Sequence, residues 1–310
     1  MGLARHLLLR GSESRWLGER LAHRPFVHRA VRRFMPGEEL DDAIEAARGL
    51  ATRSLATVLT QLGENVSSAE ETVGVATAYG RALLAIVAAG LDTDLSVKAT
   101  HLGLDLGEQL AFDNLDRLLA DAGAAGRLVA LDMEATGYVN RTLDLYRALR
   151  ARHENAGICL QAYLFRTEAD LDSLLELGPM VRLVKGAYNE PADVAFPRKA
   201  DVDLNYLLLA DRLLEARQSD PRVRIAFGTH DERMIESIIR RVDEMGLPPD
   251  ACEFQLLYGI GRDLQLRLAA AGHPVRVLIS YGSRWFPWYM RRLAERPANV
   301  GFVLRSMARN

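Results

Sequence analysis

The fold is decided by Arg127-Leu-Val-Ala-Leu-Asp-Met133, a strand-like run that leads through a helix-periodic segment, Val139–His153, to a second strand-like run, Gly157-Ile-Cys-Leu-Gln-Ala-Tyr163. The middle segment repeats its apolar residues at three- and four-residue spacing, which is typical of a helix with one buried face. A strand, a helix and another strand in this order predict two parallel strands joined by a crossover helix.

The same alternation continues in both directions along the chain. We predict strands at Leu55–Gln61, Leu95–Thr100, Arg127–Met133, Gly157–Tyr163, Met180–Lys185, Val223–Phe227, Cys252–Leu257 and Val275–Tyr281. We predict helices at Glu70–Ala88, Glu108–Ala122, Val139–His153, Glu168–Glu176, Asn205–Arg217, Glu232–Glu244 and Asp263–Ala270. This pattern predicts an α/β fold, a (β/α)8 TIM barrel over residues 46–310, preceded by an N-terminal helical arm over residues 1–45.

Composition agrees with one large barrel domain. The chain has 310 residues, and 49% of them are apolar, enough for a large core. A net charge of −2 gives no basic face for nucleic acid, so we expect no nucleic-acid partner. Cys159 and Cys252 stand far apart in apolar runs, which is typical of reduced core residues in a cytoplasmic protein. No apolar run approaches the roughly 20 residues that cross a bilayer.

The first 35 residues form a basic segment with two interpretations. Arginines outnumber acidic residues there and alternate with apolar side chains such as Trp16 and Phe26. Such a segment could lie on an anionic membrane surface, which would place the protein at the inner face of the membrane. We favour the alternative, a helical arm that packs on the body of the protein with its arginines in solvent.

Lysine is rare in this chain. Only three of the 39 basic residues are lysine, namely Lys98, Lys185 and Lys199. Lysine offers a compact charge where the planar fork of arginine does not fit. Lys98 and Lys185 lie at the ends of predicted strands, which favours a functional role, whereas Lys199 is equally compatible with chance.

Polar residues gather at the ends of the predicted strands. In chain order they are Glu64, Lys98 with His101, Asp132 with Glu134, Gln161, Arg182 with Lys185 and Tyr188, Thr229 with His230 and Asp231, Gln255, and Tyr281. Each could be structural by itself, as Asp132 would be if it capped a helix. Because active sites of TIM barrels lie where the strands end, the whole ring predicts an active site at the C-terminal mouth.

Several common sites are not supported by the sequence. Histidines and carboxylates do not repeat at metal-ligand spacing, so we predict no metal site. There is no Gly-x-Ser-x-Gly motif and no glycine-rich phosphate loop after the first strand. Gly259-Ile-Gly261 alone indicates a tight turn rather than a Rossmann nucleotide site.

Two adjacent arginines follow the last predicted strand. Arg291 and Arg292 lie in Trp285-Phe-Pro-Trp-Tyr-Met-Arg-Arg, a predicted C-terminal helix. Neighbouring residues point about 100° apart on a helix, so both reach one site only if this helix crosses the barrel mouth. With Lys98 they would then bind a small carboxylate. The alternative is a solvated arginine pair on a basic helix.

The motifs taken together resemble the proline dehydrogenase family of flavin-dependent barrels. The matching pieces are Leu62-Gly-Glu64, Ser96-Val-Lys98, Leu131-Asp-Met-Glu134, Arg182-Leu-Val-Lys-Gly-Ala-Tyr188, Thr229-His-Asp231, Glu253-Phe-Gln-Leu-Leu-Tyr-Gly259 and Tyr289-Met-Arg-Arg292. They appear in the family's order from about residue 50 to the end of the chain. The small monofunctional bacterial enzymes are the most similar members.

This resemblance implies an activity, a cofactor and partners. The reaction would be oxidation of L-proline to Δ1-pyrroline-5-carboxylate, with non-covalent FAD as the acceptor and electrons passed to a quinone. A membrane quinone would give the basic arm a purpose. The product would go to a separate pyrroline-5-carboxylate dehydrogenase.

The resemblance also implies roles for single residues. Lys98, Arg291 and Arg292 would bind the substrate carboxylate, and Tyr188 and Leu257 would line the proline pocket. Arg182 would lie near flavin N5, with Asp132 beneath substrate and flavin. Glu64 would pair with the first arginine when the site closes. The cofactor would be held by Gln161, Arg182, Val184, Lys185, Gly186, Ala187, Thr229, His230, Asp231, Gln255, Arg292 and Glu295.

One departure from the family pattern affects the substrate. The last strand usually reads Arg-x-Tyr-x-Pro-x-Gly, but here Leu278 replaces the tyrosine and Ser280 replaces the proline. A hydroxylated or N-substituted proline analogue is therefore an alternative substrate. Two further alternatives are a Schiff-base aldolase that uses Lys98 or Lys185 and a flavin-free barrel that binds an amino acid.

Overall fold

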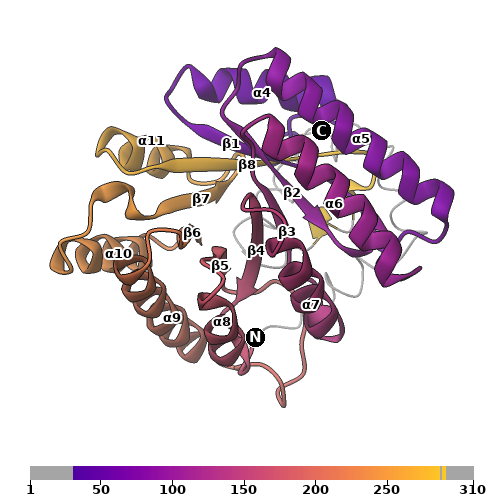
Figure 1. Ribbon diagram of the computed structural model, residues 1–310. Helices are drawn as coiled ribbons and strands as arrows, with labels where there is room; N and C mark the ends of the chain where they lie inside the picture. The colour runs from indigo at the N-terminus through magenta and orange to yellow at the C-terminus, as the bar shows by residue number, and fades with distance from the viewer. Residues whose placement is uncertain (1–30, 287, 291–310) are drawn as a thin grey trace, which may run out of the picture.

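The computed structural model describes residues 31–286 and 288–290 as a barrel of parallel strands surrounded by helices (Figure 1). The strands, β1 to β8 in cyclic order, are Ala56–Gln61, Thr93–Lys98, Val129–Asp132, Ala156–Gln161, Met180–Val184, Arg224–Gly228, Glu253–Leu257 and Val275–Tyr281. The helices, α4 to α11, are Leu40–Ala51, Ala69–Ala88, Glu108–Ala124, Val139–Arg150, Thr167–Leu175, Lys199–Ser219, Glu232–Glu244 and Arg262–Ala270. The predicted TIM barrel is confirmed.

Two elements differ from the prediction in an informative way. β2 ends at Lys98 and not at Thr100, because Thr100 begins a short 3-10 helix and donates to the Glu134 carboxylate from both its backbone N and its hydroxyl. α9 begins at Lys199, six residues before the predicted start at Asn205. Its first turn is polar and carries Asp201, which suits the positive end of the helix dipole. This turn lacks the regular spacing of apolar residues from which a helix is predicted.

The ends of the chain are described only in part. The boundary predicted between residues 45 and 46 falls inside α4, whose Ala43, Ile44 and Ala47 belong to the main core. A separate apolar cluster joins the two described ends of the chain at the close of β1, and it consists of Val31, Phe34, Met35, Leu62, Trp285, Phe286 and Tyr289. Most of the predicted arm and the residues from Arg291 onward lie outside the described residues.

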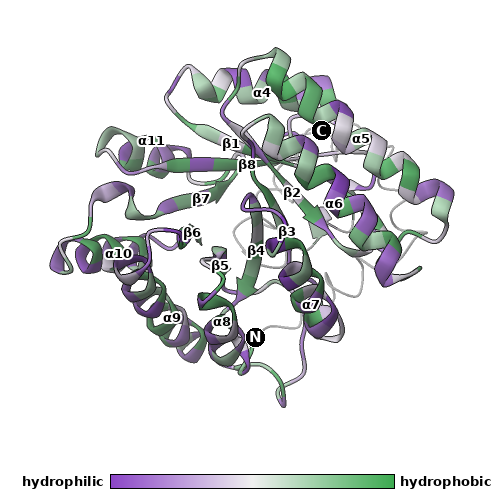
Figure 2. Ribbon diagram, in the orientation of Figure 1, coloured by the Kyte–Doolittle hydropathy of each residue, from purple (hydrophilic) through white to green (hydrophobic). Residues whose placement is uncertain are grey.

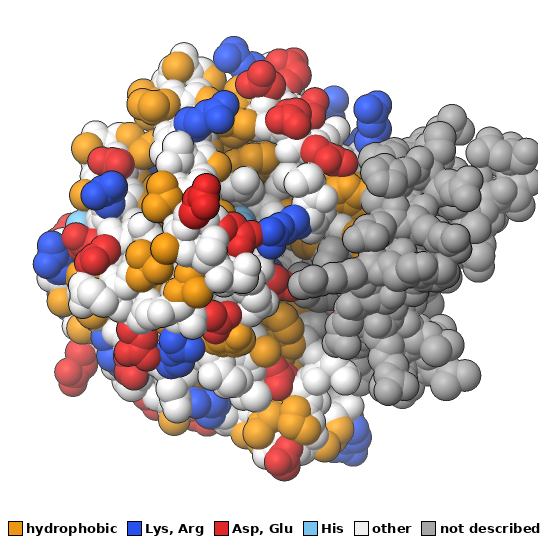
Figure 3. Space-filling model, turned by 90° about the vertical axis from the view of Figure 1, so that its right-hand side faces the viewer, with side chains coloured by type: hydrophobic (Ala, Val, Ile, Leu, Met, Phe, Trp, Pro, Cys, Tyr) orange, Lys and Arg blue, Asp and Glu red, His pale blue; other side chains and the backbone are white. Residues whose placement is uncertain are grey.

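The helices cover the barrel with their apolar sides, as the hydropathy colours indicate (Figure 2). In α5, Val75, Tyr79 and Ile86 are buried toward the strands, and each such side chain contributes about 1.5–3 kcal/mol. By length and composition alone, α5 could also cross a membrane. The face that carries α5, α6 and α7 shows acidic and basic side chains intermixed, with apolar side chains between them (Figure 3).

The interior of the barrel is polar over much of its length. Side chains alternate along each strand, so every second residue points inward. One inward layer, near the N-terminal ends of the strands, contains Asp94, Glu253 and Arg276. The next contains Ser96, Asp132, Arg182 and Gln255. These layers lead from the N-terminal end of the barrel to its C-terminal mouth.

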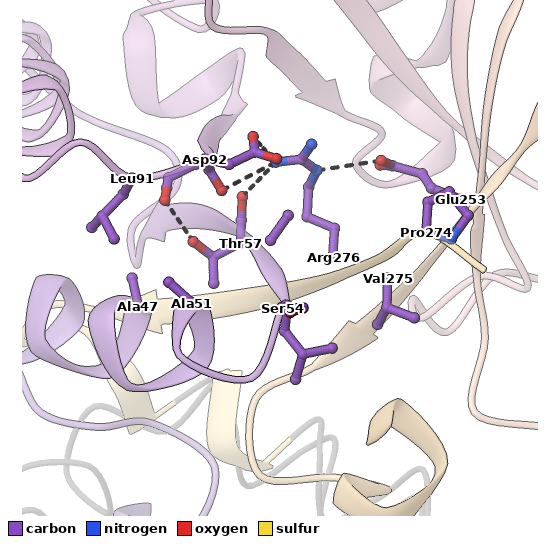
Figure 4. A pocket seen from close by; sticks show the side chains of 13 residues that line it. Ala47, Ala51, Ser54, Thr57, Leu91, Asp92, Glu253, Pro274, Val275 and Arg276 are labelled. Atoms are coloured by element: carbon purple, nitrogen blue, oxygen red, sulfur yellow. Dashed lines mark hydrogen bonds and ion pairs between the residues drawn. The ribbon is translucent and has the colours of Figure 1, made fainter. Parts of the chain in front are cut away.

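A cavity of about 360 Å³ opens at the N-terminal ends of the strands (Figure 4). Ala47 and Ala51 of α4 line one side, and the Arg276 guanidinium lies on the other with Asp92 and Glu253. Arg276 also donates to the carbonyl oxygen of Thr57 at 3.1 Å. This cavity is at the end of the barrel opposite the predicted active site.

Candidate functional site

Lys98 and Glu64 form an ion pair at the C-terminal mouth. Lys98 is the last residue of β2, and Glu64 lies in the loop after β1. The Lys98 Nζ–Glu64 Oε2 distance is 2.5 Å, and the two side chains are 19% and 27% exposed. A partly exposed ammonium at a strand end can bind a ligand carboxylate, as the sequence predicts. The predicted partner of Glu64, Arg291, lies outside the described residues.

His101 supports the loop that carries Glu64. A Cβ atom on Gly63 would lie 2.1 Å from His101 Nε2, so the backbone of the loop lies against the imidazole ring and only glycine fits. His101 is 4% exposed. Burial, and then the positive charge of Lys98, lower its pKa to about 4, so the ring is neutral near pH 7. An uncharged ring adds no repulsion toward Lys98.

Glu134 is a buried carboxyl beside the same loop. Burial raises its pKa, while the hydrogen bonds from Thr100 and the charge of Lys98 oppose that rise. Its backbone oxygen accepts from Gln161 Nε2 at 3.0 Å. Glu134 therefore ties the ends of β2, β3 and β4 together, which places Gln161 at the mouth.

Arg182 lies within the barrel and not at a strand end. It is the middle residue of β5, and its side chain is 4% exposed. The guanidinium donates to Asp132, to Ser96 Oγ at 2.8 Å and to Gln255 Oε1 at 3.2 Å. Its side chain is long, so it joins the layer of Asp132 and Gln255 beneath the mouth. The hydrogen bonds that join Arg182 to these two residues were not predicted from the sequence.

A second group of charges combines two lysines and two aspartates. Lys185 Nζ lies 2.6 Å from Asp203 and 3.0 Å from Asp231. Lys199 contacts the same two carboxylates. Burial raises the pKa of both aspartates, but the hydrogen bonds and charges of the lysines outweigh it, and the net shift is downward. The sequence did not decide whether Lys199 has a functional role. The first turn of α9, which brings Lys199 to these carboxylates, was not predicted.

Glycine at position 186 is required by the backbone and by a close neighbour. Gly186 has φ +117°, and a Cβ there would lie 2.3 Å from the Tyr163 ring. Gly228, at the end of β6, has Val184 at 2.8 Å from the place of its missing Cβ. The two glycines therefore let the Tyr163 ring and the Val184 side chain pack directly against the backbone beyond β5 and at the end of β6. Ala187 follows Gly186 in the same loop.

The loop after β6 is fixed by its histidine. The backbone N of Leu257 donates to His230 Nε2 at 2.9 Å, so that nitrogen carries no proton. Thr229 Oγ1 accepts from the backbone N of Asp231 at 3.2 Å. These bonds bring the ends of β6 and β7 together and hold Asp231 beside the lysines.

Three apolar positions predicted for the substrate pocket lie near the mouth, together with Ser280. Leu257 ends β7 and pairs in register with Leu278 of β8, and both are partly exposed, as is Tyr188. Ser280 is 1% exposed, and its hydroxyl has no hydrogen-bond partner among the described residues. Tyr281 does not join the ring, because alternation along β8 turns it into the core between strands and helices.

Three predicted residues cannot be placed. Arg291, Arg292 and Glu295 lie outside the described residues. Within residues 31–286 and 288–290, no three His, Cys, Asp or Glu side chains gather as metal ligands would. The described site thus combines cationic side chains with an arginine-centred hydrogen-bond network, which suits an anionic organic cofactor and a small carboxylate.

Comparison with known proteins identifies relatives over nearly the whole chain. The model of the proline dehydrogenase family matches residues 43–305. Proline dehydrogenase of Deinococcus radiodurans is 40% identical over 300 residues, which cover 93% of this chain and 95% of the relative. Proline dehydrogenase 1 of Bacillus subtilis subsp. natto is 37% identical over 98% of this chain and 99% of the relative.

Solved structures agree. The crystal structure of proline utilization A (PutA) from Bdellovibrio bacteriovorus, inactivated by N-propargylglycine, matches 87% of this chain with a TM-score of 0.80 at 25% identity. The chain spans 33% of that longer protein. The barrel described above therefore corresponds to one part of PutA.

Proposed function

Because this chain belongs to the proline dehydrogenase family, an oxidoreductase family, we propose that it oxidises L-proline to Δ1-pyrroline-5-carboxylate with FAD as its cofactor. The observation that carries this proposal is the convergence of the family's motif residues on one end of the barrel. Lys98 ends β2, Arg182 lies within β5 and Lys185 follows β5, and all three lie at or just below the C-terminal mouth.

The residues at the mouth fit FAD. Lys185 and Lys199 offer two ammonium groups that can exchange their aspartate partners for phosphate oxygens. Gly186 and Gly228 let Tyr163 and Val184 pack closely against the backbone of the segments that would hold the cofactor. We propose that these residues hold the cofactor with Gln161, Ala187, Thr229, His230, Asp231 and Gln255, and with Arg292 and Glu295 from outside the described part of the chain.

The substrate carboxylate would bind Lys98 once Glu64 releases it. A charge-assisted hydrogen bond to the ammonium fixes the ring, and Arg291 and Arg292 would complete the clamp. Tyr188 and Leu257 would pack against the apolar edge of proline. Glu64, freed from Lys98, would then be available to pair with Arg291 as the site closes.

FAD, when bound, supplies the hydride acceptor for the carbon next to the proline nitrogen. The protein contributes orientation and electrostatics. Asp132 and Ser96 hold the Arg182 guanidinium beneath the mouth, where its fixed positive charge would stabilise negative charge on a bound cofactor. Because this arginine is buried, that charge is weakly screened by water.

An anaerobic absorption spectrum before and after addition of L-proline tests the proposal. We expect a flavin spectrum that loses its visible bands when proline is added. A flavin spectrum unchanged by proline would contradict proline as the substrate. A protein that takes up no flavin after reconstitution with FAD would contradict the whole proposal.

A hydroxylated or N-substituted proline is a second candidate substrate. It is favoured by Ser280, whose buried hydroxyl has no partner among the described residues, and by Leu278, which occupies the family's tyrosine position. A substrate hydroxyl could pair with Ser280, whereas unsubstituted proline leaves it unpaired. Anaerobic reduction rates with proline, 4-hydroxyproline and N-methylproline distinguish the candidates.

We further propose a quinone as electron acceptor and functional coupling to a separate pyrroline-5-carboxylate dehydrogenase. The likeness to one part of the longer PutA protein supports the coupling. A cytoplasmic protein with peripheral contact at the inner face of the membrane would meet a membrane quinone. The basic arm that would make this contact lies largely outside the described residues, and sedimentation with anionic vesicles tests it.

A further inference from the structure

A continuous hydrogen-bond network runs along the barrel interior from the N-terminal cavity to the mouth. Arg276 Nε donates to Glu253 Oε2 at 3.3 Å, and Gln255 Nε2 donates to Glu253 Oε1 at 2.5 Å. Gln255 Oε1 in turn accepts from Arg182 Nη1 at 3.2 Å. Glu253 thus connects Arg276 at the N-terminal end, through Gln255, to Arg182, the arginine proposed to lie beside the cofactor.

We propose that Glu253 is a positioning residue for Arg182. A carboxylate only accepts hydrogen bonds, so it requires the Gln255 amide to present its NH2 group downward and its oxygen upward. The upward oxygen then accepts from Arg182. Glu253 therefore acts through Gln255 on the arginine that faces the cofactor, and this inference rests on the proposed FAD site.

Arg276 holds Glu253 in place. The Arg276 side chain is 9% exposed and contacts Glu253 and Asp92 (Figure 4). It also lies 3.4 Å from Asp94. Burial disfavours its charge, but these three carboxylates outweigh burial and raise its pKa. The arginine stays charged at any pH that the fold tolerates, which fixes one oxygen of Glu253 and leaves the other for Gln255.

Glu253→Gln tests the direction of these hydrogen bonds with almost no change in shape. The new amide has one accepting oxygen, and the charged Arg276 competes best for it. Its NH2 group must then face Gln255, whose own amide turns over and points NH2 at Arg182. Two donors face each other, and Arg182 loses one of its acceptors.

We expect the Glu253→Gln protein to bind FAD about tenfold more weakly, the size of one hydrogen bond to a charged group. We also expect oxidised flavin to be favoured about tenfold, which lowers the midpoint potential by about 30 mV for a two-electron couple. Flavin fluorescence titration measures the first quantity, and anaerobic redox titration measures the second. Neither depends on turnover.

Asp94→Asn is the matched control. Asp94 contacts the same arginine from the other side, at 3.4 Å, and is similarly buried, but no bond joins it to Gln255. We expect this variant to lose thermal stability while its FAD affinity and flavin potential remain those of the wild type. If both variants lose stability and neither changes these flavin properties, Glu253 is merely structural and the inference is wrong.

The double variant Glu253→Gln/Gln255→Glu restores the polarity of every bond. The new amide at position 253 accepts from Arg276 and donates to the new carboxylate at position 255, which accepts from Arg182, and the total charge is unchanged. We expect this variant to recover FAD affinity relative to Glu253→Gln, and to fold even if the single variant does not. No recovery contradicts the inference. Wild-type protein that binds no FAD contradicts instead the proposed function on which it rests.

Discussion

At the N-terminal end of the barrel, one arginine contacts three carboxylates, whereas at the C-terminal mouth single lysines pair with one or two carboxylates. The Arg276 side chain is 9% exposed, while those of Lys98 and Lys185 are 19% and 24% exposed. A deeply buried cation with several fixed partners holds strands together. A partly exposed cation with few partners can exchange them for a ligand.

Removing the buried cation should have the largest effect. We expect Arg276→Met to reduce the free energy of unfolding by about 3–5 kcal/mol, because Glu253 and Asp94 are left buried without their partner. Urea denaturation measures the loss. Arg222→Met, which removes an exposed pair with Asp220, should leave the midpoint of urea denaturation nearly unchanged. Equal losses of stability in the two variants would contradict a special structural role for the buried Arg276 ion pairs.

Acid should reduce the free energy of unfolding, because the folded protein holds His101 in its neutral form. Below pH 6.5 the unfolded chain protonates this histidine, while the folded chain, with its pKa of about 4, does not. Stability should therefore fall as the pH drops from about 6.5 to about 4, by about 3 kcal/mol in all. Denaturation at several pH values measures the slope. In His101→Gln the slope in this window should be much smaller, and an unchanged slope would exclude His101 as its source.

Removing the exposed cation should change catalysis and leave stability nearly intact. We expect Lys98→Ala to raise KM for proline roughly 10- to 100-fold, the size of one or two hydrogen bonds to a charged group. The free energy of unfolding should change by less than about 1 kcal/mol, because the pair with Glu64 is partly exposed. Arg127→Ala, a similarly exposed cation at the other end, should leave KM unchanged. If Lys98→Ala lost stability without a change in KM, Lys98 would be a structural residue and not a substrate-binding one.

The smallest effect concerns substrate choice at the mouth. Leu278→Tyr should change the ratio of kcat/KM between proline and 4-hydroxyproline by about tenfold, since a new hydroxyl and a larger ring enter the pocket. Competition assays with both substrates measure this ratio. If the ratio stays the same, Leu278 does not contact the part of the substrate in which the two compounds differ.

The sequence predicted the barrel because each element carries its own local pattern. β8 and α10 have the predicted bounds, since an apolar strand and a strongly amphipathic helix need no distant partner to be recognised. The beginning of α9 was missed, and with it the grouping of Lys199 with Lys185. Its first turn is polar and becomes helical beside the ends of β5 and β6, a context that no local period reveals.

The mouth residues were predictable, but their partners were not. Polar residues at strand ends identify a mouth in any parallel barrel, and so Lys98, Gln161 and Lys185 were found. The bond between Glu253 and Gln255 was not predicted. Alternation places the two residues on one face of β7, but only the folded barrel turns that face inward and brings Arg276 and Arg182 to it. Likewise, the orphan hydroxyl of Ser280 follows from burial by strands far away in the sequence.

The barrel is closed by pairing its first strand with its last. β1 and β8 match over Ala56–Gln61, and Arg276 reaches the backbone of Thr57 across 219 positions of sequence. Loop closure over such a distance costs conformational entropy before any contact repays it. During synthesis, β1 therefore waits with an open edge until the last strand has left the ribosome. Exposed edges of this kind favour association between chains, so newly made protein should depend on rapid completion or on chaperones.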